Sequence, residues 1–207
     1  MIYQMLAMLI LATFYTFYFA KIIILKRQSI KTNQMGIGKK PKKVLRIERI
    51  MGFATVLTTI FDIGSIFLVK QFPANGFRII GIVLGIIGVM FFVLATITMK
   101  TSWRVGIPEE KTSLITDGIY NWSRNPAFVG FDLLFLSICL MYFNILLVCV
   151  SVWAAVMLHL QILQEETHMY HMFGDEYVQY TKQTLRYFGK KDLIPRRDCH
   201  EFYIFWR

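Results

Sequence analysis

Long apolar segments are the feature that most constrains the fold of this chain. Ile2 to Leu25 is nearly uninterrupted apolar and aromatic sequence. A helix of that length measures about 36 Å, enough to cross a hydrocarbon core of about 30 Å with some tilt. Ile50 to Val69 and Phe77 to Met99 have the same character. The chain is 56% hydrophobic and 17% charged, against about 45–50% and about 25% in soluble domains. The sequence therefore predicts an all-α integral membrane protein.

The apolar region from Pro126 to Leu163 predicts two helices rather than one. A single helix over this region would be about 57 Å long, far more than a bilayer needs. Tyr142 to Asn144 interrupts it with polar and aromatic residues. We therefore expect a fourth helix from Pro126 to about Met141 and a fifth from Asn144 to about Leu163. Proline suits the first turn of the fourth helix, because the missing N–H would be unpaired there anyway. Five transmembrane helices result.

Basic residues lie between the apolar segments and predict the topology. The first loop, residues 26–49, holds nine basic residues and the single acid Glu48. With five spans, this loop, the loop 100–125 and the C-terminal tail share one side, which the positive-inside rule makes cytoplasmic. We expect the N-terminus outside and the C-terminus in the cytoplasm. The net charge of +10 then indicates contact with membrane lipids and no nucleic-acid partner. A lipid-phosphate patch on the first loop is an alternative to a purely topological role.

Two features of the spans have a structural and a functional interpretation. Asp62 lies in the second span, where an acid is costly and counts as a functional candidate by default. Its neighbours Gly64 and Ser65 favour a structural role in helix packing. Gly81 and Gly85 form a small-xxx-small face in the third span. We interpret this face as a close helix contact, with contact to a cofactor as the alternative.

Two polar segments beside the spans contain the residues best suited to binding and chemistry. The loop 100–125 is long, and structureless loops of such length are often functional. It brings aromatic side chains, an arginine and the backbone amides of a helix start, which favour an anion. Glu165 and Glu166 follow the fifth helix and can pair with an ammonium group. Together the segments suit a zwitterionic amino-acid moiety, and tyrosine or tryptophan faces attract a sulfonium cation. Alternatively, Arg124 and the two acids form only interfacial ion pairs.

The spacing of these residues resembles a known family. Gly-x-Tyr-x-x-x-Arg-Asn-Pro-x-Phe-x-Gly begins at Gly118, and Glu-Glu-x-x-x-x-x-x-Phe-Gly-x-x-Tyr-x-x-Tyr begins at Glu165. This pattern is similar to the isoprenylcysteine carboxyl methyltransferase family, part of a wider membrane group that includes phospholipid N-methyltransferases. The similarity covers roughly Trp103 to Arg186. It implies an S-adenosylmethionine-dependent methyltransferase with five or more helices. The cytoplasmic cofactor pocket is then expected between the loop before the fourth helix and the C-terminal helical segment.

The resemblance also implies roles for individual residues. The positions that match the cofactor-binding positions of the family are Thr112, Ser113, Leu114, Ile115, Tyr120, Asn125, Pro126, Ala127, Phe128 and Glu165. Many relatives have His and Tyr in place of Asn125 and Phe128. Gln161 stands where the eukaryotic enzymes have an arginine associated with substrate, so we expect Gln161 in the substrate site. The candidates for catalysis are Arg104, Arg124, Arg186 and Glu166. No metal site is predicted.

The predicted function is methyl transfer to a lipophilic acceptor within a single domain. Residues 1–99 form a three-helix scaffold, 100–190 the catalytic motif region and 191–207 a tail. The carboxylate of a prenylated cysteine-type thioether is favoured as acceptor, and it needs no general base because it is ionised at neutral pH. The alternative is N-methylation of a phospholipid ethanolamine group, which must first lose a proton. His168 and His171 are nearby, but we expect them to face the surface. A sterol reductase-like protein using NADPH and a non-enzymatic membrane scaffold are the third possibilities.

Overall fold

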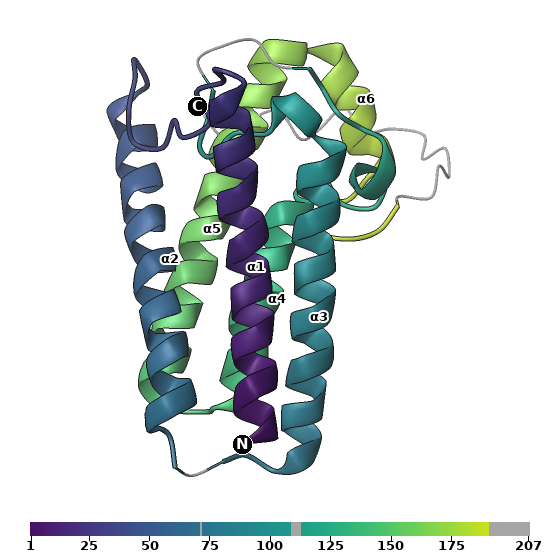
Figure 1. Ribbon diagram of the computed structural model, residues 1–207. Helices are drawn as coiled ribbons and strands as arrows, with labels where there is room; N and C mark the ends of the chain where they lie inside the picture. The colour runs from purple at the N-terminus through teal and green to yellow at the C-terminus, as the bar shows by residue number, and fades with distance from the viewer. Residues whose placement is uncertain (71, 109–112, 191–207) are drawn as a thin grey trace, which may run out of the picture.

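The computed structural model describes residues 1–70, 72–108 and 113–190, which form a bundle of helices (Figure 1). The elements are α1 (Ile2–Arg27), α2 (Lys42–Leu68), α3 (Asn75–Thr98), η1 (Lys100–Ser102), η2 (Gly118–Asn121), α4 (Pro126–Met141), α5 (Ile145–Phe173) and α6 (Asp175–Gln183). Four of them, α1, α2, α3 and α5, are long and apolar enough to cross a membrane, and α4 is a shorter apolar helix. The prediction of an all-α integral membrane protein is confirmed.

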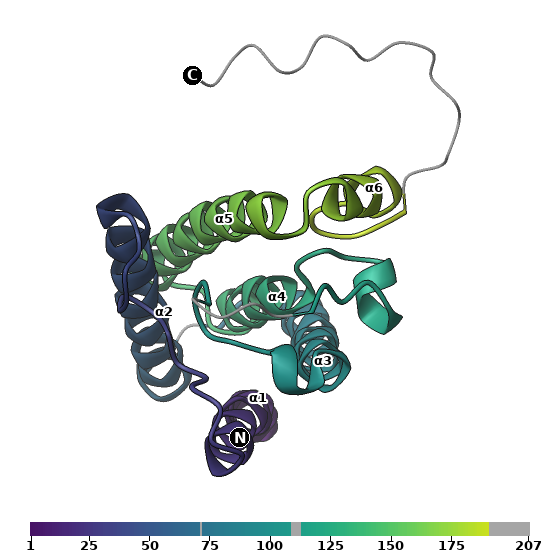
Figure 2. The ribbon, with the colours of Figure 1, turned by 90° about the horizontal axis from the view of Figure 1, so that it is seen from above.

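The first five α-helices alternate in direction along the bundle (Figure 1). The N-terminus therefore lies at one end, while η1, η2 and α6 lie at the other, which we call the site end. Figure 2 shows α4 in the middle of the bundle, with α3 and α5 on either side of it. The α2 helix packs beside α5, and α1 lies near α3 (Figure 2). The loop before α4 is thereby surrounded by the ends of several helices.

Two helices extend further than the apolar pattern predicted. The α2 helix begins at Lys42 rather than Ile50, and α5 continues to Phe173 rather than ending near Leu163. The added turns are rich in lysine, arginine, glutamine and glutamate, which are good helix formers in water. The first loop is therefore shorter than predicted, since four of its nine basic residues belong to α2. Gly174, with φ of 51°, ends α5.

Glycines let α3 and α4 approach closely. A Cβ atom added at Gly88 would lie 2.9 Å from the carbonyl oxygen of Gly130 on α4. One added at Gly85 would lie 2.6 Å from the Ser137 Oγ atom. The interpretation of these α3 glycines as a helix-packing face is confirmed. The contact fixes the start of α4 relative to the end of α3, which together border the site.

Polar groups inside the bundle mostly find partners in neighbouring helices. The Thr58 hydroxyl donates to the carbonyl oxygen of Val150 at 3.1 Å and so joins α2 to α5. The Asn144 side chain accepts from the Leu147 N–H at 2.9 Å, which caps α5. Asp62 is fully buried and faces the bundle interior, as expected of an acid at this depth. Within the described chain, its carboxylate oxygens have no hydrogen-bond partner.

Candidate functional site

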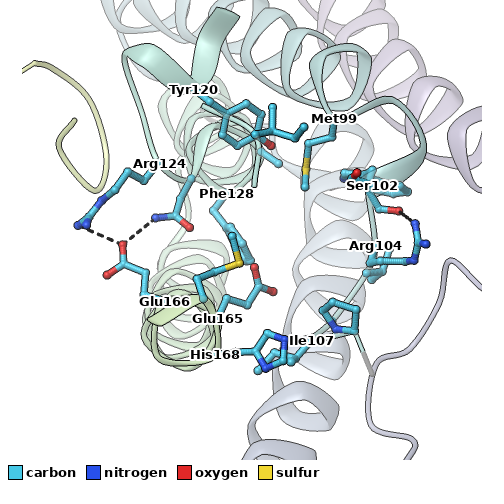
Figure 3. A pocket seen from close by; sticks show the side chains of 18 of the residues that line it. Met99, Ser102, Arg104, Ile107, Tyr120, Arg124, Phe128, Glu165, Glu166 and His168 are labelled. Carbon is cyan, nitrogen blue, oxygen red and sulfur yellow. Dashed lines mark hydrogen bonds and ion pairs between the residues drawn. The ribbon is translucent and has the colours of Figure 1, made fainter. Parts of the chain in front are cut away.

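A cavity opens at the site end of the bundle, where the loops meet the helix ends (Figure 3). Its volume is ≈ 1320 Å³ with the open mouth included. The cavity continues into the apolar interior, where helices α1 to α5 line it with Tyr18, Met51, Phe92, Phe131 and Leu158. It therefore has a polar part among the loops and an apolar part between the helices.

Most of the predicted cofactor residues come together in this cavity. The residues that line it are Ser113, Leu114, Ile115, Tyr120, Asn125, Ala127, Phe128 and Glu165. Three of the four predicted catalytic residues also line it, namely Arg104, Arg124 and Glu166. Pro126 does not line it, because it is buried in the first turn of α4. Thr112 lies outside the described residues.

Three tyrosines build one wall of the cavity. Tyr120 lies on η2, and Tyr177 and Tyr180 lie on one face of α6; all three are buried. The Tyr180 hydroxyl donates to the carbonyl oxygen of Tyr120 at 2.6 Å. This hydrogen bond joins α6 to the loop before α4 that carries the first motif, which we call the motif loop. Burial raises the pKa of the Tyr120 and Tyr177 hydroxyls well above the ordinary value, because their ionised forms lose contact with water. This wall therefore stays neutral.

Glu166 is the centre of a buried ion-pair network. Its Oε1 atom accepts from the Asn125 side-chain amide and pairs with the Arg124 guanidinium, both at 3.2 Å. Its Oε2 atom accepts from Arg186 Nε at 3.0 Å and from Arg186 Nη2 at 2.8 Å. These hydrogen bonds raise the pKa of the Arg186 guanidinium. The ion-pair interpretation therefore describes Glu166 well, and one carboxylate serves two arginines.

The segment after α6 holds the motif loop against α5. Arg124 N–H donates to the carbonyl oxygen of Leu185 at 3.1 Å, and Gly189 N–H donates to that of Trp122 at 2.6 Å. The Trp122 and Phe188 rings stack with centroids 5.9 Å apart. Arg186, predicted as catalytic, does not line the cavity, because its guanidinium is turned to Glu166 behind the wall. It acts on the site through that contact.

Glu165 lines the cavity as Glu166 does (Figure 3), but within the described residues it makes no ion pair. Its Oε1 atom accepts from the Gln161 side-chain amide at 3.0 Å. Gln161 is fully buried and is not among the residues that line the cavity, and its contact with substrate stays a prediction. Residues four apart on α5 stack on one face, and Glu165 lies nearer the open end. Gln161 orients Glu165.

His168 also faces the cavity, one turn beyond Glu165 (Figure 3). The expectation that it faces the surface is wrong, because α5 extends past the membrane and brings this residue beneath the loops. His171, in contrast, is exposed as expected. The site therefore contains a carboxylate and an imidazole side by side on one helix.

Motif analysis missed part of the cavity wall. Met35 from the first loop and Met51 and Thr55 from α2 line the cavity, although the first loop has no part in the motif pattern. These contacts join residues far apart in sequence, and no local spacing announces them. One feature of the sequence could have indicated a role for the first loop: Glu48 is the single acid there among nine basic residues.

Comparison with known proteins agrees with this geometry. Residues 77–176 match the Phospholipid methyltransferase family, over just under half of the chain, from α3 to the start of α6. The matched part contains Tyr120, Asn125 and Glu165. No match was found among curated proteins. The family match supports a membrane methyltransferase of the wider group that the motifs indicated. It does not separate carboxyl methylation from phospholipid methylation.

Proposed function

We propose that this protein is an S-adenosylmethionine-dependent methyltransferase that acts on a lipophilic acceptor at the membrane. The observation that carries the proposal is the cavity itself. It presents the Glu165 carboxylate among neutral tyrosines at its polar end and continues between the helices as an apolar chamber. A charged cosubstrate and a lipid chain need these two environments in one space.

The residues present fit the cofactor. When bound, S-adenosylmethionine supplies an electrophilic methyl group, and transfer leaves the bonding electron pair on sulfur. The Glu165 carboxylate suits the cofactor's ammonium group or ribose hydroxyls. The faces of Tyr120 and Phe128 suit a sulfonium cation or an adenine ring. The first turn of α4, at Ala127, favours the cofactor's carboxylate. Since the acceleration comes mainly from positioning and exclusion of water, the buried network around Glu166 serves the reaction by keeping these groups in place.

We propose an amine-bearing phospholipid headgroup as the acceptor. The family match names phospholipid methyltransferases, and the charges of the site agree with an amine. Arg124 and Arg186 share the one Glu166 carboxylate, which balances one of their two charges, whereas the Glu165 carboxylate and the His168 imidazole line the cavity without an ion pair in the described chain. An amine has to lose a proton before its lone pair can attack the methyl group. Since Glu165 is assigned to the cofactor, the His168 imidazole, which also lines the cavity, is our candidate to accept that proton.

A carboxylate acceptor, such as a prenylated cysteine-type thioether, is the second candidate. The observation in its favour is Arg104, which lines the cavity and is held by hydrogen bonds from Nη1 to the carbonyl oxygens of Thr101, at 2.6 Å, and Trp103, at 3.0 Å. A carboxylate would need such a cation and no base. The reductase alternative is weaker, because the described lining residues include two arginines, Arg104 and Arg124, and Arg124 is already paired with Glu166.

The orientation in the membrane forms part of the proposal. The basic first loop and the cavity lie at the site end, so the positive-inside rule puts the cavity on the cytoplasmic side and the N-terminus outside.

Transfer of a labelled methyl group tests the acceptor. Purified protein in detergent is mixed with labelled S-adenosylmethionine and either phosphatidylethanolamine vesicles or an S-farnesyl cysteine acid. The proposal predicts label in N-methylated phospholipid, with little in the farnesyl ester. Glu165→Gln should abolish most transfer, whereas Glu176→Gln, an exposed acid on α6, is the matched control and should not. If label appears only in the farnesyl ester, the acceptor is a carboxylate and not an amine.

A further inference from the structure

The connection between α1 and α2, residues 28–41, belongs to neither motif and lies outside the family match. We call it the α1–α2 loop. We propose that this loop forms part of the wall of the acceptor half of the cavity, the half that holds the lipophilic acceptor. In this proposal Met35 limits the acceptor's hydrocarbon chain, and Glu48 and Lys40 position Met35. The inference rests on the proposed function and deepens it by naming residues that select the acceptor.

A buried carboxylate fastens the loop in place. Glu48 is fully buried, and the Lys40 side chain is only 6% exposed. Both Glu48 oxygens lie 2.9 Å from Lys40 Nζ. Glu48 Oε2 also accepts from the Gly36 N–H at 2.7 Å, and Oε1 accepts from the Ile107 N–H at 2.8 Å. One side chain on α2 therefore holds both the α1–α2 loop and the segment that follows η1. Such a saturated buried carboxylate is costly to form and indicates a fixed geometry.

Backbone pairing joins the same two segments directly. Gln34 N–H donates to the Val105 carbonyl at 2.9 Å, and Val105 N–H donates to the Thr32 carbonyl at 3.0 Å. Gly106 has φ of +83°, and a Cβ atom added there would lie 2.9 Å from Met35 Cα. Only glycine allows this approach without strain. Backbone hydrogen bonds and Glu48 thus both fix the α1–α2 loop to the segment that follows η1.

Met35 extends from this loop into the apolar part of the cavity. A Cβ atom added at Gly52 would lie 2.9 Å from Met35 Cε, so the thioether lies against α2. Met35 packs in the cluster that contains Met51, Phe128 and Leu158. This cluster is separate from the one formed by Tyr120, Tyr177 and Tyr180 with Leu114 and Ile115. We assign the Met35 cluster, apart from Phe128, to the acceptor half of the cavity and the tyrosine cluster to the cofactor half.

The position and chemistry of Met35 suit selection by size. Methionine is unbranched and adapts its shape to neighbouring hydrocarbon. A hydrophobic pocket discriminates by small changes in volume, about 10- to 200-fold per methylene group. Gly36, next in the chain to Met35, donates to Glu48. Loss of the Glu48 or Lys40 charge should therefore affect the acceptor half more than the cofactor half.

Paired measurements on variants test the inference. For Met35→Trp, Met35→Ala and the control Ile37→Trp, on an exposed position of the same loop, the Kd for S-adenosylmethionine and the KM for vesicle phosphatidylethanolamine or S-farnesyl cysteine acid are measured. We expect Met35→Trp to raise the acceptor KM about tenfold or more with an unchanged cofactor Kd. Met35→Ala should shift preference toward bulkier chains, and Ile37→Trp should change neither constant.

Variants of the ion pair add a second, independent readout. Lys40→Met should raise the acceptor KM more than the cofactor Kd. Lys40→Arg, which keeps the charge, should have an acceptor KM close to that of the wild type. An unchanged acceptor KM in Met35→Trp would overturn the inference. So would equal losses of cofactor and acceptor binding in Lys40→Met, which would indicate a general structural role. Wild-type protein that binds no S-adenosylmethionine would instead refute the proposed function, so the two failures are distinguishable.

Discussion

The adjacent acids Glu165 and Glu166 should respond very differently to the same substitution. In Glu166→Gln, the network loses the negative charge of the carboxylate. The new amide N–H groups also face the N–H donors of Asn125, Arg124 or Arg186. Arg124, whose side chain is 9% exposed, is left without its counter-ion, and removing one member of a buried pair costs about 3–5 kcal/mol. The Arg186 contact adds less, because that side chain is 36% exposed and screened by solvent. The retained amide oxygen offsets part of the loss, so we expect a destabilisation of about 3 kcal/mol.

Glu165→Gln should leave the fold nearly intact and weaken the cofactor. In the described chain its hydrogen-bond partner is Gln161, and an amide can replace that contact, so the free energy of unfolding should change by less than about 1 kcal/mol. Loss of a charge-assisted contact to the ligand is worth about 1.5–3 kcal/mol. The Kd for S-adenosylmethionine should then rise about 10- to 150-fold.

Denaturant unfolding in detergent and calorimetric titration of S-adenosylmethionine measure the two quantities. Glu176→Gln, on the exposed side of α6, is the control for both. The reasoning would be refuted by a Glu166→Gln protein as stable as the wild type. It would also be refuted by a Glu165→Gln protein that binds the cofactor with unchanged affinity.

Three further predictions concern topology, pH and packing. In a cysteine-free background, cysteines placed at the exposed positions Lys31 and Lys182 should resist labelling from outside intact cells, whereas one at Asn75 should react; labelling at Lys31 alone would contradict the five-span topology. Turnover on an amine acceptor should rise about tenfold per pH unit below the acceptor's pKa, whereas turnover on a carboxylate should be flat from about pH 6 to 8, and initial rates across that range decide between them. Gly88→Ala should destabilise the bundle by about 1–3 kcal/mol, because its Cβ would lie 2.9 Å from the Gly130 carbonyl oxygen, while Gly76→Ala, with no atom within 4 Å, serves as control in thermal unfolding and should have little effect.

The helices could be predicted from hydropathy and from local signals at their ends. Pro126 and Asn144 mark the starts of α4 and α5 in the sequence, and the predicted α4 has the observed bounds. The starts and ends that lie in water were harder to predict, because apolar sequence stops at the membrane while the backbone hydrogen bonds do not. The α2 helix therefore continues back to Lys42, directly after Pro41, and α5 continues to the break at Gly174.

The candidate site could be predicted in part. Motif spacing found this part of the cavity wall because its residues lie in two short segments, around Tyr120 and Glu165. It assigned Glu165 to the cofactor and Glu166 to catalysis, but it could not predict the ion-pair network of Glu166, because only the packed structure brings Arg124 and Arg186 to that carboxylate. Met35 was missed because contacts between loops distant in sequence place it in the cavity wall.

Equilibrium binding of labelled S-adenosylmethionine to the purified protein tests the central claim most directly. The account predicts saturable binding at one site per chain, displaced by unlabelled S-adenosylhomocysteine, weakened at least about tenfold by Glu165→Gln and unchanged by Glu176→Gln. Folded wild-type protein that shows no saturable binding would contradict the assignment of this cavity as a methyltransferase site.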